Sequence, residues 1–320
     1  MAQEFLPLCD VLFNIISMAS YFCDVVFDVI TAYTLYQQQQ WVWLCLAVVF
    51  IASSLVISQI LSAKWFLQRH SSNTSSPASS AGEAAASGSV SESPKEVNRG
   101  ALVGMHLVGI GVLWRYFKLF IPVDLRIVKH EVRDLCMLRL THAFVEAAPM
   151  LLVQLYLIWL KPSRDQVSDL NVVSTVLSLF SVCWALASFN KNVRRQHVHK
   201  LVLTWLGVIF QFMWRLGTVT SRVVALTVYA TVYSYWVFLV IGLHWISMFF
   251  WLISPRNVFH GDRMSKIKKD VYCALIAVVY IFCYVNLQHV NPRMKMAAFY
   301  VTMFLVLTLM FYDAHLRTHF

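Results

Sequence analysis

The chain contains 320 residues, of which 59% are hydrophobic and only 13% are charged. Soluble domains are about 45–50% apolar and about 25% charged, so this composition excludes a water-soluble globular enzyme, a disulfide-rich secreted scaffold and a disordered protein. The net charge of +10 comes from basic residues in short loops between apolar runs, which is typical of membrane proteins rather than of nucleic-acid-binding surfaces. The predicted fold is an all-α polytopic membrane protein, because about eight runs approach the roughly 20 apolar residues that a bilayer span needs.

The first part of the chain is predicted to form two spans followed by a loop. Apolar runs cover 11–36 and 41–63, and the uncharged tract Gln37–Gln40 separates them, so residues 1–63 hold the first two spans. Residues 64–100 are rich in Ser, Ala and Gly and contain little that a core could bury. This composition predicts a flexible loop.

The rest of the chain divides at two basic loops. Residues 101–190 contain three apolar runs, residues 191–253 begin with the loop KNVRRQHVHK at 191–200 and contain three more, and residues 254–320 begin with a basic loop at 254–270 and contain the last two spans. The runs lie at 101–121, 135–160, 170–189, 200–216, 218–234, 235–253, 271–287 and 295–312.

The distribution of Lys and Arg predicts the orientation, because cytoplasmic loops carry an excess of both. We therefore place the loops at 64–100, 191–200 and 254–270 in the cytoplasm, and the tract Gln37–Gln40 and the charge-balanced loop 161–169 outside. Three runs then separate successive cytoplasmic loops, although an even number must cross, so one run of each three is predicted to be a partial or re-entrant helix. The arrangement has about eight full spans and two partial helices in a pseudo-twofold internal repeat, with both termini cytoplasmic.

Polar side chains inside the apolar runs are the candidate functional residues. An ionisable side chain at the bilayer centre costs about 2.5–3.5 kcal/mol on insertion scales, so such residues usually face a partner or a cavity. Asp24 and Asp28 lie four residues apart and share one face of the first span. Glu146 and Gln154 belong to a run that also contains Pro149, which removes a backbone hydrogen bond and favours a bent or re-entrant helix.

Arg215 and Arg222 interrupt a later run in the same way. These acids and bases either form buried structural ion pairs or line a polar path, and the sequence leaves both explanations open. We hypothesise that Glu146 and Arg222 occupy equivalent places in the two repeats and neutralise each other.

No catalytic or cofactor motif accompanies these residues. The chain lacks GxSxG, HExxH, Walker A and GxGxxG patterns, and its seven cysteines include no CxxC pair. Buried cysteine is ordinarily a small hydrophobe, so neither a zinc site nor a disulfide framework is expected. We expect a protein that is not an enzyme and that needs no cofactor.

Three segments carry a resemblance to a known family. DLCMLRLTHAFVEAAPMLLVQLYLIW at 134–159, MWRLGTVTSRVVALTVYA at 213–230 and the first-span stretch YFCDVVFDVITAYTLY resemble blocks of the XK-related family in order and spacing. The sequence departs from the family pattern at His142, where the family has Glu, and at Met150, where it has Gln.

The resemblance implies a phospholipid scramblase of the plasma membrane, which exposes phosphatidylserine by moving lipids passively between leaflets. It implies a lipid path through a furrow open sideways to the bilayer, and the residues that would line it are Asp24, Asp28, Glu146, Gln154, Arg215 and Arg222. Its implied partners are membrane phospholipids and either a single-span chaperone subunit or a lipid-transfer protein. Caspase gating, also implied by the family, finds no aspartate in loop 64–100.

The sequence is also consistent with two other functions. In the first, the buried charges are structural and the basic loops dock a bridge-type lipid-transfer protein or anionic lipids, so that the protein is a non-scrambling adaptor. In the second, the chain is an ion-coupled transporter with a closed midplane site, although no Gly-rich unwound segment marks one.

Overall fold

The computed structural model describes residues 8–74, 114–116, 125–161, 169–194, 205–254, 266–285 and 293–319. Within these ranges the chain is helical and contains no strand, which confirms the predicted all-α class. The elements are α1 Leu8–Gln37, α2 Trp41–Thr74, α5 Leu125–His142, the π-helical turn η1 Ala143–Ala147, α6 Ala148–Trp159, α7 Asp169–Arg194, α8 Trp205–Tyr233, α9 Trp236–Ile253, α10 Lys266–Phe282 and α11 Arg293–His319.

The first two helices form a hairpin, as the sequence predicts. A tight turn joins them, closed by the bond from the Gln40 amide to the Leu35 carbonyl at 3.0 Å. The second helix continues to Thr74, so the segment after 63 that was predicted as loop begins as helix. The remainder of that predicted loop, 75–100, lies outside the described residues.

The run that contains Pro149 is one continuous helical segment, α5–η1–α6. Its part Asp134–Trp159 is long and apolar enough to cross a membrane, so the prediction of a re-entrant helix at Pro149 is wrong. Proline lies in the first turn of α6, where its missing N–H and fixed φ are tolerated. The irregularity is the π-helical turn Ala143–Ala147 just before it.

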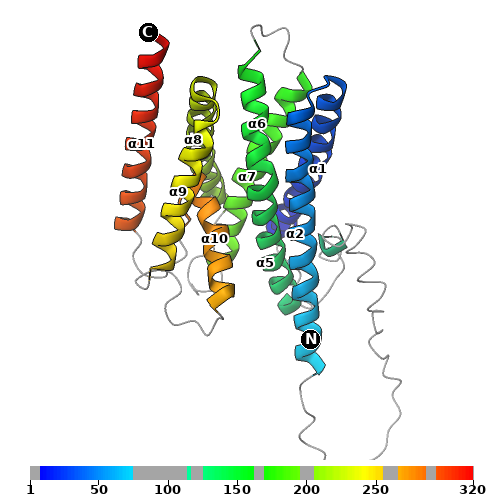
Figure 1. The fold of residues 1–320 in the computed structure, drawn as a ribbon. Coiled ribbons are helices and arrows are strands. Elements are labelled where there is room, and N and C mark those ends of the chain that lie inside the picture. Colours follow the sequence, from blue (N-terminus) through cyan, green and yellow to red (C-terminus); the bar gives the residue numbers. More distant parts are fainter. Residues whose placement is uncertain are drawn as a thin grey trace, which may run out of the picture.

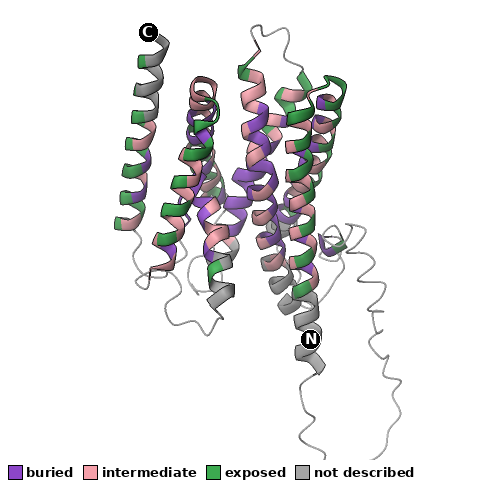
Figure 2. Cartoon of the chain, in the orientation of Figure 1, coloured by how far each residue is buried: buried purple, intermediate pink, exposed green. Residues whose placement is uncertain are grey.

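Helix α7 is the central helix of the first half and contacts α1, α5, η1, α6 and α8. Small side chains recur on its buried face, at Ser174, Ser178, Ser181, Ala185 and Ser188. Because small residues let helix backbones approach closely inside a membrane, this spacing explains why α7 can serve several neighbours. Buried residues gather in the middle of the bundle, while exposed ones cover its outer helices (Figure 2).

Helix α8 corrects the division of the second half. The runs predicted separately at 200–216 and 218–234 form a single helix, Trp205–Tyr233, because Gly217 between them does not interrupt it. Two helices, α8 and α9, therefore lie between the second and third basic loops, and the partial helix predicted within 191–253 is not needed.

The partial helix of the second half is α10 instead. It starts near the end of α9 and stops partway along the bundle (Figure 1). Its apolar part, Cys273–Phe282, is about 15 Å long at 1.5 Å per residue, roughly half of the hydrocarbon thickness. The chain then leaves the helix at Cys283–Val285, which is buried in protein, as non-helical backbone at membrane depth must be.

The helix ends agree with part of the predicted orientation. The ends of α2, α7 and α9 lie at one end of the bundle, and the α1–α2 turn and the end of α6 lie at the other (Figure 1). The described helix ends that lead into the three basic loops therefore lie at one end of the bundle. The described chain starts at the lower end with α1 and finishes at the upper end with α11 (Figure 1), and the placement of both termini in the cytoplasm stays a prediction.

Five segments in the described part of the chain are long and apolar enough to span a bilayer: Leu12–Gln37, Trp41–Lys64, Asp134–Trp159, Asp169–Lys191 and Trp236–Ile253. Large apolar side chains on the outer surface, such as Phe238 on α9 and Phe304 on α11, are more than 60% exposed. Extended exposed apolar surface of this kind is expected where lipid is the solvent. The polytopic membrane fold is confirmed, and eight full spans stay a prediction.

Candidate functional site

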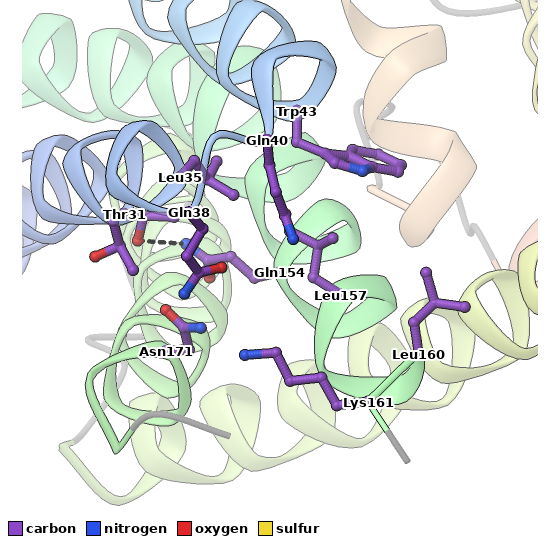
Figure 3. A pocket seen from close by; sticks show the side chains of 11 residues that line it. Thr31, Leu35, Gln38, Gln40, Trp43, Gln154, Leu157, Leu160, Lys161 and Asn171 are labelled. Atoms are coloured by element: carbon purple, nitrogen blue, oxygen red, sulfur yellow. Dashed lines mark hydrogen bonds between the residues drawn. The ribbon is translucent and has the colours of Figure 1, made fainter. Parts of the chain in front are cut away.

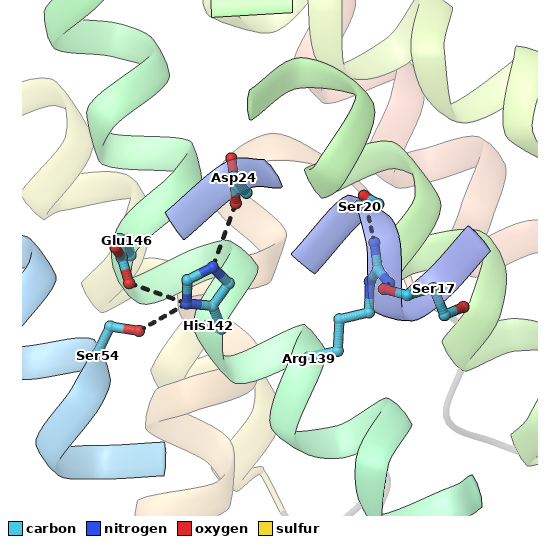
Figure 4. Close-up of polar contacts among 7 residues, drawn as sticks. All are labelled: Ser17, Ser20, Asp24, Ser54, Arg139, His142 and Glu146. Carbon is cyan, nitrogen blue, oxygen red and sulfur yellow. Dashed lines mark hydrogen bonds and ion pairs between the residues drawn. The ribbon is translucent and has the colours of Figure 1, made fainter. Parts of the chain in front are cut away.

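An acidic cluster lies where α1, α5 and η1 meet; it consists of Asp24, Asp28, His142 and Glu146. Its centre is His142, whose Nε2 lies 3.2 Å from Asp24 Oδ2 and whose Nδ1 lies 2.9 Å from Glu146 Oε2 (Figure 4). Ser54 of α2 places its hydroxyl 3.0 Å from the same Nδ1. Carboxylates only accept hydrogen bonds and a neutral imidazole donates through one nitrogen, so two ionised carboxylates on opposite nitrogens specify a protonated, cationic His142.

The local helix geometry positions this pair. Glu146 lies in the π-helical turn four residues after His142, so the two side chains emerge on the same face. Single π-helical turns inside α-helices are often found at functional sites. The irregular turn thus occurs where the buried charges are concentrated.

Asp28 adds a third carboxyl group to the cluster. It lies one helical turn after Asp24, is fully buried and interacts with Asp24, Glu146 and His142. Neither of its carboxylate oxygens meets hydrogen-bond geometry with a described group. Three carboxylates therefore surround one imidazolium, and the full set of ionised groups would be strongly unfavourable in an apolar interior without a further cation or proton.

Arg139 is the nearest other cation and lies one turn before His142 on α5. Its guanidinium is buried and donates to the Ser17 carbonyl and, at 2.6 Å, to the Ser20 hydroxyl (Figure 4). It also interacts with Asp24. Even with Arg139 counted, three acids face two cations.

A second polar group follows towards the upper end of the bundle. The Gln154 amide donates to Ser174 at 2.8 Å and to Thr31 at 3.3 Å, and the two hydroxyls lie 3.0 Å apart. Beyond it, a cavity of about 240 Å³ opens between α1, α2, α6 and the start of α7 (Figure 3). Amides, hydroxyls and one ammonium line much of this cavity, namely Thr31, Thr34, Gln38, Gln40, Gln154, Lys161 and Asn171.

These groups form a continuous polar column along one face of α1. From Ser17 to Thr31 the column rises about 21 Å at 1.5 Å per residue, which is about two thirds of the roughly 30 Å hydrocarbon core. Its members are Ser17, Ser20, Asp24, Asp28, Thr31, Ser54, Arg139, His142, Glu146, Gln154 and Ser174. Each of these is buried, so the furrow open sideways to lipid that was predicted is closed in this structure.

The structure brings four of the six predicted path residues into this column and leaves two elsewhere. Arg215 and Arg222 lie on α8, where Arg215 Nη1 donates to the Tyr284 carbonyl at 2.7 Å and Arg222 Nε to the Ile281 carbonyl at 3.1 Å. The carbonyls at a helix C-terminus have no intrahelical partner and carry partial negative charge. The arginines therefore stabilise the broken end of α10.

The hypothesis that Glu146 and Arg222 neutralise each other is wrong. Glu146 pairs with His142 and Arg222 with backbone oxygen. Each residue therefore has another partner in the fold.

Sequence reasoning missed His142, Arg139 and Ser174. A signal existed: Arg139, His142 and Glu146 are spaced at i, i+3 and i+7, which places them on one helical face. His142 was read only as a departure from a family Glu, whereas it is the centre of the acidic cluster. The second departure, Met150, is fully buried and packs with Leu35 and Ala47.

A protein-family model matches nearly the whole chain. The model described as XK-related protein matches residues 12–315, nearly the full length. The chain belongs to the XK-related family. The match includes the first span, the α5–η1–α6 segment and α8, so the polar column and the arginines at α10 both lie within the family region.

Proposed function

We propose that this member of the XK-related family is a phospholipid scramblase, which moves lipids passively between leaflets of the plasma membrane and exposes phosphatidylserine. The observation that carries the proposal is the polar column on α1, because so many buried acids, amides and hydroxyls in one row exceed what helix packing requires. Polar residues inside membrane helices usually mark substrate or ion pathways.

The physical problem in scrambling is the head group. Moving an unpaired charge or an unsatisfied hydrogen-bonding group through hydrocarbon costs several kcal/mol or more, while the acyl tails can stay in the bilayer. A path that offers Gln154, Asp28 and the His142 pairs in succession replaces water for the head group. Because no covalent bond changes, the reaction needs neither a catalytic residue nor a cofactor.

Transit requires the column to open. Its side chains are sealed between α1 on one side and α5–η1–α6 and α7 on the other, so we infer that the closed state is described here and that α1 with α2 must move away from α6. The surplus acid in the cluster favours such opening, because water or a cationic head group would then solvate Asp28.

A non-scrambling adaptor is the second candidate. The burial of all column side chains favours it, because sealed charges serve a structural role equally well. In that function the column fixes the packing of α1, and the basic loops bind a lipid-transfer protein.

Reconstitution separates the two functions. The purified chain is incorporated into liposomes that contain a fluorescent phospholipid, and dithionite then bleaches the outer leaflet. Scrambling predicts loss of nearly all fluorescence, because inner-leaflet lipid reaches the reductant, whereas an adaptor leaves about half, as protein-free liposomes do. Protein-containing liposomes that keep this half, with the protein shown to be folded, would overturn the proposal.

A further inference from the structure

The cavity at the upper end of the polar column has the chemistry of a specific head-group site. One wall carries the Lys161 ammonium, which extends towards Asn171 and Gln38 (Figure 3). Apolar side chains, Trp43, Leu157 and Leu160, form another part of the lining. A polar pocket bordered by apolar surface is suited to a polar head group attached to acyl chains.

Two residues that line this cavity carry a buried amide oxygen with no donor among the described groups. Gln154 uses its amide nitrogen for Ser174 and Thr31, and its Oε1 has no hydrogen bond to a described group. Gln40 Oε1 is likewise buried without a described partner. A buried acceptor without a partner costs about 1–3 kcal/mol, so both oxygens favour a ligand that brings N–H or O–H groups.

The position of the charged group in the cavity favours the same kind of ligand as the two amide oxygens do. Lys161 supplies the positive charge of the lining, and the buried carboxyl group of Asp28 lies one turn below Thr31, beyond the inner wall. A zwitterion with its anionic end at Lys161 and its cationic end at Gln154 complements this arrangement. The volume of about 240 Å³ is below the roughly 300–1,000 Å³ of drug-sized sites, which suits a head group alone.

We propose that this cavity binds phospholipids whose head group carries a primary ammonium, with the phosphate at Lys161 and the ammonium donating to Gln154 and Gln40. Phosphatidylethanolamine and phosphatidylserine have such N–H donors. Phosphatidylcholine has the same phosphate and positive charge but no N–H group, so it leaves both acceptors unsatisfied. The inference rests on the proposed function for its ligand class and adds a head-group preference to it.

Direct binding tests the site without any need for scrambling. Dihexanoyl phosphatidylethanolamine, phosphatidylserine and phosphatidylcholine are titrated, below their micelle concentrations, into the full chain in detergent and followed by calorimetry. We expect the two primary-amine lipids to bind about tenfold more tightly than phosphatidylcholine, the effect of a charge-assisted hydrogen bond. Equal affinity for all three lipids would overturn the proposal.

Variants assign the preference to the named groups. Gln40→Leu, at the half-buried mouth, and Gln154→Leu should each reduce the ratio, and the two together should bring it to about one. Lys161→Gln should weaken all three lipids by a similar factor. Gln211→Leu on α8 and Lys64→Gln at the end of the second span, which do not line the cavity, are matched controls and should change nothing. An unchanged ratio in the double variant would contradict the assignment.

Two water-soluble probes distinguish the source of the head group. Phosphoethanolamine and inorganic phosphate should bind far more weakly than the short-chain lipids, because they cannot use the apolar lining. Phosphoethanolamine binding as tightly as its lipid would assign the cavity to a soluble ligand instead. If the protein prefers primary-amine lipids but liposomes do not scramble, the head-group site is supported and the proposed function is wrong. If liposomes scramble and the protein shows no lipid preference, the proposed function is supported and the head-group site is wrong.

Discussion

The acidic cluster and the arginine pair, Arg215 and Arg222, have different kinds of partner for their buried ionisable groups. Both are ionisable groups buried in apolar helices. The cluster is made only of side chains, with three carboxylates around His142, whereas the arginines bond backbone carbonyls freed by the end of α10. Each arginine thus has a backbone oxygen as its partner, whereas the cluster gathers more carboxyl groups than the one imidazole can pair with.

We infer from this difference that the arginine pair has a structural role and the acidic cluster a role in transport. A cation held by the C-terminal end of a half-helix contributes to a fixed architecture, because its partners exist only while α10 stays broken at that depth. A cluster with unsatisfied acid favours whatever brings a proton, water or cation to it. We therefore expect substitutions at the arginines to affect folding alone, and some substitutions in the column to affect transport without affecting folding.

The largest effect is expected from His142→Leu, which strands Asp24 and Glu146 as unpaired buried acids. Removing one partner of a buried pair costs about 3–5 kcal/mol, or about 10 °C in melting temperature for a chain of this size. Thermal unfolding in detergent measures it. The same chain with Asp24→Asn and Glu146→Gln added should recover most of the loss, and a further drop would contradict the pairing.

Arg222→Met comes next and tests the structural half of the comparison. It removes the bond to the Ile281 carbonyl, and hydrogen bonds that involve a charged group are worth about 1.5–3 kcal/mol. The melting temperature should fall by about 5 °C, while the surviving folded protein scrambles at the parental rate. Lys64→Met, at an exposed cation, is the control. Slower scrambling by a well-folded Arg222→Met protein would contradict the purely structural role and indicate that Arg222 belongs to the lipid path.

Ser54→Ala should have a smaller effect, because it removes one hydroxyl from a nitrogen that Glu146 already contacts. A single hydrogen bond contributes about 0.5–1.5 kcal/mol net, so the melting temperature should fall by about 2–4 °C. Ser53→Ala, whose hydroxyl bonds only the Phe50 carbonyl of its own helix, is the matched control. A drop as large as that of His142→Leu would show that Ser54, not the acids, holds the imidazole.

The sequence predicts the parts of this fold that depend on local pattern. Apolar runs give the helices, loop charge places α2, α7 and α9 ends on one side, and four-residue spacing puts Asp24 and Asp28 on one face. Which groups pair depends on which helices pack together, and the apolar pattern does not show this. The pairing of Arg222 with a carbonyl of α10 could therefore not be predicted from the sequence. The end of α10 could not be predicted either, because apolar residues continue at 283–285 and no proline or glycine there marks the end of the helix.

Asp28→Asn should alter stability least and decides the comparison most directly. The amide keeps the shape of the carboxyl group and cannot ionise, and neither carboxyl oxygen has a hydrogen bond to a described group, so the melting temperature should change by less than about 2 °C. If the surplus acid draws head groups into the column, dithionite bleaching should slow at least about threefold, a barrier change of about 0.6 kcal/mol. Asp169→Asn, at the start of α7 and outside the column, is the control. Unchanged scrambling in a stable Asp28→Asn protein would mean that the acidic cluster, like the arginine pair, serves only to hold helices together.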